Sequence, residues 1–112
     1  MNRGEIWLAR LAPTIGTEIS KTRPVVLVND DRVGILPLKV AVPVTQWSDR
    51  FATRAWMVRL EPTLENGLKK PSAVDTFQIR SLSEDRLTRY LGKLSDSEMR
   101  SISQALKIVL SL

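Results

Sequence analysis

An arginine ends the longest predicted connection of the chain, and its side chain is suited to binding phosphate. Residues 12–22 separate two strand-like segments by more than a hairpin requires. Arg23 follows directly, and a guanidinium is always charged and offers a planar fork of donors that matches phosphate. The alternative is a surface arginine paired with Glu18 or Asp30. Arg23 is therefore a candidate phosphate ligand.

A hydroxyl and an aromatic ring follow at the end of another strand-like segment. Thr45 and Trp47 are two residues apart, so in a regular strand they share one face. A hydroxyl beside an aromatic ring can hold a phosphate and stack an unpaired base. Threonine is also simply a good strand residue, and tryptophan is often a core or interface residue.

A third polar cluster, Gln78, Arg80 and Ser81, follows the last strand-like segment. Taken alone, it indicates only that a sheet ends in polar groups.

The composition excludes much of the common catalytic repertoire. With no Cys and no His, the chain has no disulfide, no Cys/His zinc site and no Ser-His or Cys-His triad. Its 17 Lys and Arg against 12 Asp and Glu give a net charge of +5. A basic domain favours a polyanionic or acidic partner, with a solvated basic surface as the alternative. Residues 1–60 carry +4 of this charge, so we expect the positive field mainly there.

The elements that must position these groups are strands first and a helix last. The 112 residues predict one domain, 1–112, without a linker. Short apolar runs separated by turn formers predict strands. These runs lie at 5–11, 24–29, 36–45, 55–60 and 72–79. They suggest a small β-barrel, in which 24–29 is apolar on both faces and Pro24 opens the strand.

The last part of the chain has a helical period. Ser95 and Glu98 form a capping box, and an apolar stripe follows them at helical spacing. We expect this helix to pack on the barrel or on a second subunit. A weaker helical turn is predicted over residues 84–90 with Ser83 as its cap. No signal peptide or membrane-spanning run is evident, so we expect a cytoplasmic protein without a membrane partner.

Together these segments resemble the MazF/PemK family of toxin endoribonucleases, over nearly the whole chain. The matching segments are RGEIWL (3–8), PTIGTEI (13–19), KTRPVVLV (21–28), PVT (43–45), QIRSL (78–82) and RL (86–87) ahead of Gly92. The block from Gly-Thr-Glu to Arg-Pro-Val-Val is the most specific, because it joins a particular loop to a particular strand.

The resemblance implies a fold, an activity and partners. The fold is mainly β with a C-terminal helix, an SH3-like barrel of the CcdB/MazF/PemK type. The activity is cleavage of single-stranded RNA without metal or cofactor. The partners are a second copy in a homodimer and a cognate antitoxin, and DNA is reached only through the antitoxin. On physical grounds we expect an acidic, partly disordered antitoxin segment that folds across the basic groove.

The resemblance also implies site residues. By the match of motifs, the catalytic arginine and threonine are Arg23 and Thr45, the loop glutamate is Glu18, and the RNA contacts are Gln78 and Arg80. We count Glu18 among the catalytic residues on chemical grounds, and we also expect Lys21, Gln46 and Trp47 to contact RNA. One position departs from the pattern: Phe77 stands where many members have an acidic residue, and Asp75 lies two residues earlier. Base selection at that edge is therefore expected to differ.

The simplest metal-free chemistry is attack of a 2′-hydroxyl on the adjacent phosphorus, which leaves a 2′,3′-cyclic phosphate and a 5′-hydroxyl. Arg23 suits charge stabilisation, Thr45 can add a neutral hydrogen bond, and Glu18 is the candidate base.

Two other functions use the same architecture. A CcdB-like gyrase poison ends in Trp-Gly-Ile, which this chain lacks. A plain nucleic-acid-binding barrel would bind RNA and leave it intact.

Overall fold

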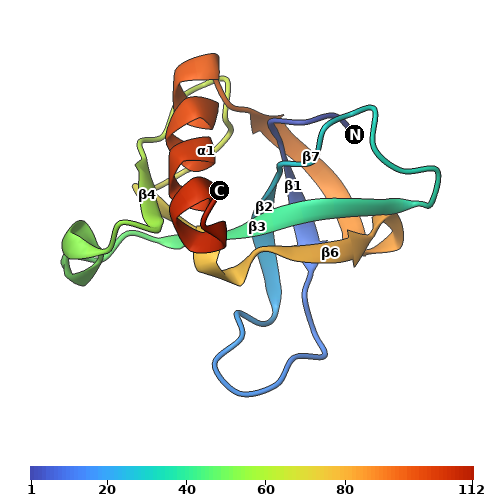
Figure 1. Cartoon of the computed structure of the whole chain (residues 1–112), viewed down its shortest axis with the longest axis horizontal. Coiled ribbons are helices and arrows are strands. Elements are labelled where there is room, and N and C mark those ends of the chain that lie inside the picture. The colour runs from blue at the N-terminus through green and yellow to red at the C-terminus, as the bar shows by residue number, and fades with distance from the viewer.

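The fold is a curved antiparallel sheet with one α-helix packed against it (Figure 1). The computed structural model describes residues 1–112. The strands are β1 (Glu5–Arg10), β2 (Thr22–Leu27), β3 (Leu38–Gln46), β4 (Met57–Leu60), β5 (Ser72–Asp75), β6 (Arg80–Ser83) and β7 (Leu87–Lys93). The 3-10 turns are η1 (Asp49–Thr53), η2 (Thr76–Gln78) and η3 (Glu84–Arg86), and the helix is α1 (Asp96–Leu110). The strand order is β4-β5-β3-β2-β1-β7, and β6 pairs with β3.

Strand β3 organises the sheet, because it pairs with β2, β5 and β6. Alternate side chains of a strand point to opposite faces, and both faces of β3 are buried. Val42 and Val44 belong to the core cluster that also contains Ile102 of the helix, whereas Ala41 belongs to a second cluster. Strand β2 is divided in the same way between the two clusters, so its predicted burial on both faces is confirmed.

The helix α1 forms as the sequence predicts and packs on the sheet. The Ser95 side chain accepts a hydrogen bond from the Glu98 backbone N–H, and the Glu98 carboxylate accepts one from the Ser95 N–H. Ile102 and Ala105 are buried on the inner face. Burying an isoleucine side chain such as that of Ile102 contributes roughly 2 kcal/mol to the free energy of folding. No helix of this chain is long and apolar enough to cross a membrane.

The predicted helical turn at 84–90 is wrong beyond its first residues. The Ser83 side chain does accept a hydrogen bond from the Asp85 N–H, but it caps only the short turn η3. Leu87 then begins β7, which pairs with β1. The strand predicted at 72–79 is also too long: it ends at Asp75, whose carboxylate accepts from the Phe77 N–H and caps η2.

Pro24 does not open β2 as expected, because the strand begins two residues earlier, at Thr22. Proline cannot donate to a ladder and is therefore confined to strand starts and edges. Strand β2 pairs with β3 only from Val25 to Leu27, so its first residues form an edge on that side. The missing N–H of Pro24 is tolerated there.

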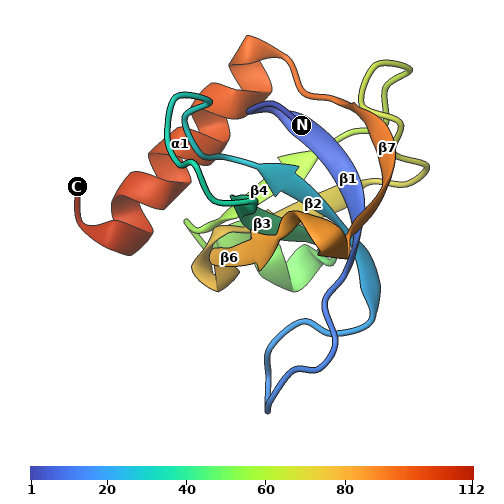
Figure 2. The same cartoon turned by 90° about the vertical axis from the view of Figure 1, so that its right-hand side faces the viewer.

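The long connection between β1 and β2, residues 11–21, extends away from the rest of the molecule in both views (Figures 1 and 2). We call it the β1–β2 loop. Its base is closed by a hydrogen bond from the Leu11 N–H to the Lys21 carbonyl oxygen, 2.9 Å. Lys21 has a φ of 69°, a left-handed conformation that is uncommon outside glycine. The chain therefore turns sharply just before β2 begins.

Candidate active site

Arg23 and Thr45 line one cavity of about 330 Å³, which we call the Arg23 cavity. The pairing of β2 with β3 places Val25 opposite Pro43. Arg23 and Thr45 each lie two residues beyond this pair, where the two strands no longer pair. The other residues that line the cavity are Leu8, Pro24, Val44, Gln46, Gly67, Leu68, Lys69, Lys70, Ser72, Arg89 and Leu91.

The Arg23 cavity is strongly positive. No carboxylate lines it, and the four cationic side chains that do are those of Arg23, Lys69, Lys70 and Arg89. The four salt bridges of the protein all involve other residues. The cations therefore repel one another without compensation inside the protein. Such an arrangement attracts an anion.

Arg23 itself has an unmet hydrogen-bonding requirement. Its Nε is buried and has no hydrogen-bond partner. A buried donor left without a partner costs about 1–3 kcal/mol, and such groups in native proteins call for an explanation. The alternative interpretation of Arg23 as a paired surface residue is wrong. Asp30 pairs with Arg32 at 2.8 Å, and the Glu18 carboxylate accepts from the Ile15 N–H.

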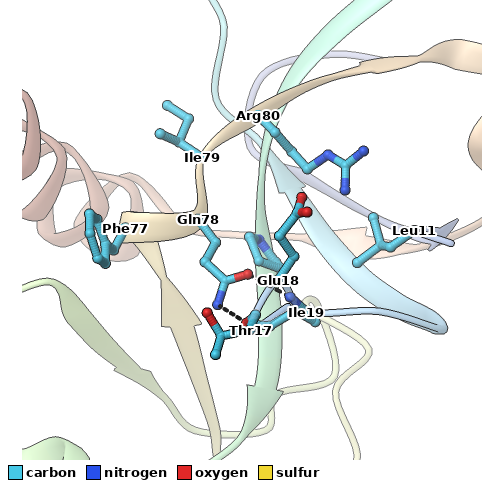
Figure 3. A pocket seen from close by; sticks show the side chains of 9 residues that line it. Leu11, Thr17, Glu18, Ile19, Phe77, Gln78, Ile79 and Arg80 are labelled. Carbon is cyan, nitrogen blue, oxygen red and sulfur yellow. Dashed lines mark hydrogen bonds between the residues drawn. The ribbon is translucent and has the colours of Figure 1, made fainter. Parts of the chain in front are cut away.

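A second cavity, of about 260 Å³, adjoins the first, and we call it the Gln78 cavity. Figure 3 shows the side chains that line it, which come from the β1–β2 loop and from the segment around η2. They are Leu11, Thr17, Glu18, Ile19, Pro43, Phe77, Gln78, Ile79 and Arg80. Pro43 borders this cavity and Val44 and Thr45 border the other, so the two are neighbours along β3.

Gln78 joins the two walls of its cavity. Its Oε1 accepts a hydrogen bond from the Ile19 N–H at 2.6 Å. Its Nε2 donates to Asp75 Oδ2 at 3.2 Å and, at 3.5 Å, to the Thr17 carbonyl oxygen (Figure 3). The amide therefore tethers the β1–β2 loop to η2.

Asp75 helps to hold the Gln78 amide in place by accepting one of its hydrogen bonds. Its side chain is 7% exposed and accepts hydrogen bonds from the Phe77 N–H and from Gln78 Nε2. Burial raises the pKa of Asp75 above its ordinary value, although these hydrogen bonds act in the opposite direction.

Glu18 and Arg80 project toward the same space in the Gln78 cavity (Figure 3). They form no ion pair with each other. Glu18 Oε1 instead accepts from the Ile15 N–H at 2.8 Å, within its own loop. Glu18 therefore lies beside the Arg23 cavity rather than in it.

The other residues predicted to contact RNA, Lys21, Gln46 and Trp47, do not all line the two cavities. Gln46 is exposed and lines the Arg23 cavity, whereas Lys21 is exposed and lines neither cavity. Trp47 also lines neither: the Arg59 guanidinium lies 4.8 Å from its ring centroid, and Phe51 packs against it edge-on. A base could stack on that face only after Arg59 moved.

Sequence reasoning missed three cations, Lys69, Lys70 and Arg89, which line the first cavity. Phe77, noted from the sequence as a departure that affects base selection, is 71% exposed and lines the second cavity as an accessible aromatic ring. The adjacent lysines and the departure at Phe77 were visible signals, but only the fold shows where they lie. No group of three or more acidic residues that could hold a metal ion occurs in the structure.

Comparison with known proteins gives consistent matches. A family model described as PemK-like, MazF-like toxin of type II toxin-antitoxin system matches residues 2–110. Endoribonuclease MazF9 of Mycobacterium tuberculosis is 35% identical over 118 residues, which cover 100% of this chain and 98% of that protein. Endoribonuclease MazF of Staphylococcus saprophyticus is 33% identical over 112 residues, which cover 100% and 92%.

Solved structures confirm the predicted fold class. A mycobacterial endoribonuclease in complex with its cognate antitoxin superposes with a TM-score of 0.79 at 25% identity, covering 100% of this chain and 96% of that chain. MazF of Deinococcus radiodurans gives a TM-score of 0.82 at 21% identity, covering 100% and 97%.

Proposed function

Because the chain belongs to the PemK-like, MazF-like toxin family of type II toxin–antitoxin systems, we propose that it is an endoribonuclease that cleaves single-stranded RNA. The observation that carries the proposal is the Arg23 cavity, where four unpaired cations surround a threonine hydroxyl without any carboxylate. Two relatives that match the whole chain are named endoribonucleases. An RNA phosphate supplies the negative charge that the cavity lacks.

The chemistry assigned to the cavity is transfer of the phosphoryl group within the RNA. The 2′-oxygen forms a bond to phosphorus, and the bond from phosphorus to the 5′-oxygen breaks. The 2′-proton passes to a base and a proton is delivered to the leaving oxygen, so the products are a 2′,3′-cyclic phosphate and a 5′-hydroxyl. Negative charge builds on the non-bridging oxygens during this step. In this proposal Arg23 donates to those oxygens and Thr45 adds a neutral hydrogen bond, which their common place in one cavity supports.

Glu18 is assigned the base. The Arg23 cavity offers no carboxylate, and Glu18 is the carboxylate of the adjoining cavity. An RNA that spans both cavities brings its 2′-hydroxyl to their boundary on β3. Glu18 lies on the β1–β2 loop, and its hydrogen bond with the Ile15 N–H holds the carboxylate within that loop.

The Gln78 cavity is assigned the reading of a base. It presents both hydrogen-bond donors and hydrogen-bond acceptors, from Gln78, Arg80 and Thr17. These groups lie beside the exposed ring of Phe77. Single-stranded RNA is read through unstacked bases that pack on aromatic rings and form hydrogen bonds at their edges. Gln46 adds a polar contact in the Arg23 cavity, and Lys21 adds positive charge beside the loop.

The family also implies partners. We assign the protein to a toxin–antitoxin pair and to a homodimer, and the likeness to an endoribonuclease solved with its cognate antitoxin supports the first assignment. An acidic antitoxin segment fits the Arg23 cavity because it replaces the phosphate charge. A cytoplasmic location follows from the proposed substrate, cellular RNA.

The test is digestion of a long mixed-sequence RNA by the purified protein with chelator present. We expect discrete cuts that persist in chelator, with 2′,3′-cyclic phosphate on one side and a 5′-hydroxyl on the other. Binding of RNA with steep salt dependence but without cuts would contradict the nuclease assignment and indicate a binding module.

A further inference from the structure

Three cations in the Arg23 cavity exceed what the proposed chemistry at one phosphate requires. Arg23 and Thr45 together donate enough hydrogen bonds for the non-bridging oxygens of a single phosphate. Lys69, Lys70 and Arg89 line the same cavity and have no acidic partner. Their charge is available to a second anionic group.

The lysines stand on a loop, residues 61–71, whose backbone is fixed from within. Asn66 is fully buried, and its Oδ1 accepts from the Thr63 N–H and the Leu68 N–H, both at 3.0 Å. Its Nδ2 donates to the Glu61 carbonyl oxygen at 2.9 Å. Buried side-chain amides satisfied in this way hold a loop in one conformation.

The same loop is pressed against β7, the strand that carries Arg89. Gly67 has a φ of +68°, and a Cβ there would lie 2.1 Å from the Leu91 carbonyl oxygen. A Cβ on Gly92 would lie 2.4 Å from the Glu65 carbonyl oxygen. Only glycine permits so close a contact of two backbones. The loop carrying the lysines and the strand carrying Arg89 therefore form one rigid unit.

The far end of the loop is fixed to the strand that carries Thr45. The Trp47 N–H donates to the Pro71 carbonyl oxygen at 3.0 Å, and Ser72 Oγ donates to the Lys70 carbonyl oxygen at 2.8 Å. The lysine backbone is thus held at a set distance from the end of β3. Because this backbone is already fixed, binding an anion at the lysines costs no ordering entropy of the loop itself.

We propose that Lys69, Lys70 and Arg89 bind the phosphate next to the scissile phosphate of the RNA. The inference rests on the proposed function, which places the scissile phosphate at Arg23 and Thr45. The cavity volume of about 330 Å³ is roughly ten times the share of one water in the liquid, so it admits more than one phosphate group. The second phosphate fixes the position of the strand along the cavity.

The first experiment measures binding of a fully 2′-O-methylated, mixed-sequence single-stranded RNA, which has no 2′-hydroxyl to attack, as a function of salt. Each phosphate contact contributes about 0.7 to the slope of log K against log salt. Because both lysines are placed at one phosphate, Lys69→Ala/Lys70→Ala should lower the slope by up to about 0.7. For variants that bind equally at 1 M salt, this weakens binding about fivefold at 0.1 M salt. Lys69→Arg/Lys70→Arg keeps both charges and should keep the slope.

The matched control is Arg100→Ala/Lys107→Ala, which removes two charges from exposed positions on α1 that line neither cavity. We expect it to leave the slope within a few tenths. Equal slopes for the two double variants would overturn the proposal, even if cleavage by the wild type is intact. Binding that follows the proposal without any cleavage would contradict the nuclease assignment alone.

A second experiment distinguishes a neighbouring phosphate from the scissile one. Two RNAs are built around a mapped cut. One carries a neutral methylphosphonate at the linkage on the 5′ side of the cut, and the other carries it at the linkage on the 3′ side. For one of the two linkages, we expect slower single-turnover cleavage by the wild type and no further loss in Lys69→Ala/Lys70→Ala. Additive losses at both linkages would overturn the assignment to a neighbouring phosphate.

Discussion

The two cavities of this protein adjoin on β3 but are built differently. The Arg23 cavity is lined by unpaired cations, and Arg23 and Thr45 stand on strands of the central sheet. The Gln78 cavity mixes Glu18, Arg80 and an amide that is already hydrogen-bonded, and one of its walls is a projecting loop.

The difference indicates which cavity needs fixed geometry and which can vary. Charge stabilisation of a phosphate is the same for every RNA, and it benefits from donors fixed by strand pairing. We expect base selection to depend on the β1–β2 loop, because a surface loop can change in sequence without disturbing the sheet. We therefore assign the chemistry to the Arg23 cavity and the selectivity to the Gln78 cavity.

The largest effect is expected from Arg23→Ala. Loss of one preorganised donor to a developing oxyanion typically costs on the order of 10²- to 10³-fold in rate. Because the substitution removes a buried donor that has no partner, it should not lower the unfolding midpoint. Single-turnover cleavage and thermal unfolding measure the two quantities. Arg100→Ala, exposed on α1, is the control, and full activity of Arg23→Ala would remove Arg23 from catalysis.

Glu18→Gln should come next, with a loss of about 10²-fold, the usual contribution of a general base. Glutamine keeps an oxygen that can accept from the Ile15 N–H, so the loop conformation is preserved. Single-turnover cleavage of an RNA built around a mapped cut is the measurement. An unchanged rate would show that Glu18 belongs to the Gln78 cavity alone and that the base lies elsewhere.

Thr45→Ala should reduce cleavage about tenfold, since a neutral hydrogen bond contributes roughly 0.5–1.5 kcal/mol. Thr45→Ser keeps the hydroxyl and should retain most of the rate. Single-turnover rates for both variants are the measurement. Equal losses in the two variants would mean that the methyl group, and so packing, is what matters at this position.

Gln78→Ala should change which sites are cut more than how fast they are cut. The variant loses the tether to Ile19 and Asp75 as well as any contact with a base. Discrimination among sequences should fall by up to about tenfold, the value of one lost hydrogen bond. Ser81→Ala, three residues later in the chain and outside both cavities, is the control for competitive cleavage of a mixed RNA pool.

The smallest effect concerns Asp75 and pH. Burial raises its pKa in the folded protein, so the folded state binds this proton more tightly than the unfolded state does. The free energy of unfolding should therefore fall as pH rises from the ordinary value of 3.8 through the raised pKa. Asp75→Asn removes that contribution. Urea unfolding between about pH 3.5 and 7 should show the two proteins diverging in this window, and parallel curves would contradict the assignment.

Much of the fold could be predicted because its longest elements are strongly patterned. The helix α1 carries its own capping box and apolar stripe, and β3 alternates regularly. Strands β6 and β7 were not predicted, since they become strands by pairing with β3 and β1. The capping prediction at Ser83 is confirmed, but the capped turn ends at Arg86. From Leu87 the chain pairs with β1 as a strand.

The site could be predicted only in part, for a related reason. Arg23 and Thr45 lie on the neighbouring strands β2 and β3, and strand phase indicated that both face the one cavity that they line. Lys69 and Arg89 are brought to that cavity by the contact of residues 65–67 with β7, which no local pattern reveals. The expectation that the positive field belongs to the first 60 residues is wrong for this cavity, because only Arg23 of its four cations precedes residue 60.

Sequencing the ends that wild type, Arg23→Ala and Gln78→Ala leave on one mixed RNA tests the division between the cavities most directly. We predict that Arg23→Ala lowers cutting by the same factor at every site and leaves the set of sites unchanged. Gln78→Ala should redistribute cuts among sites at a similar total rate. A uniform loss in Gln78→Ala together with altered sites in Arg23→Ala would contradict the account.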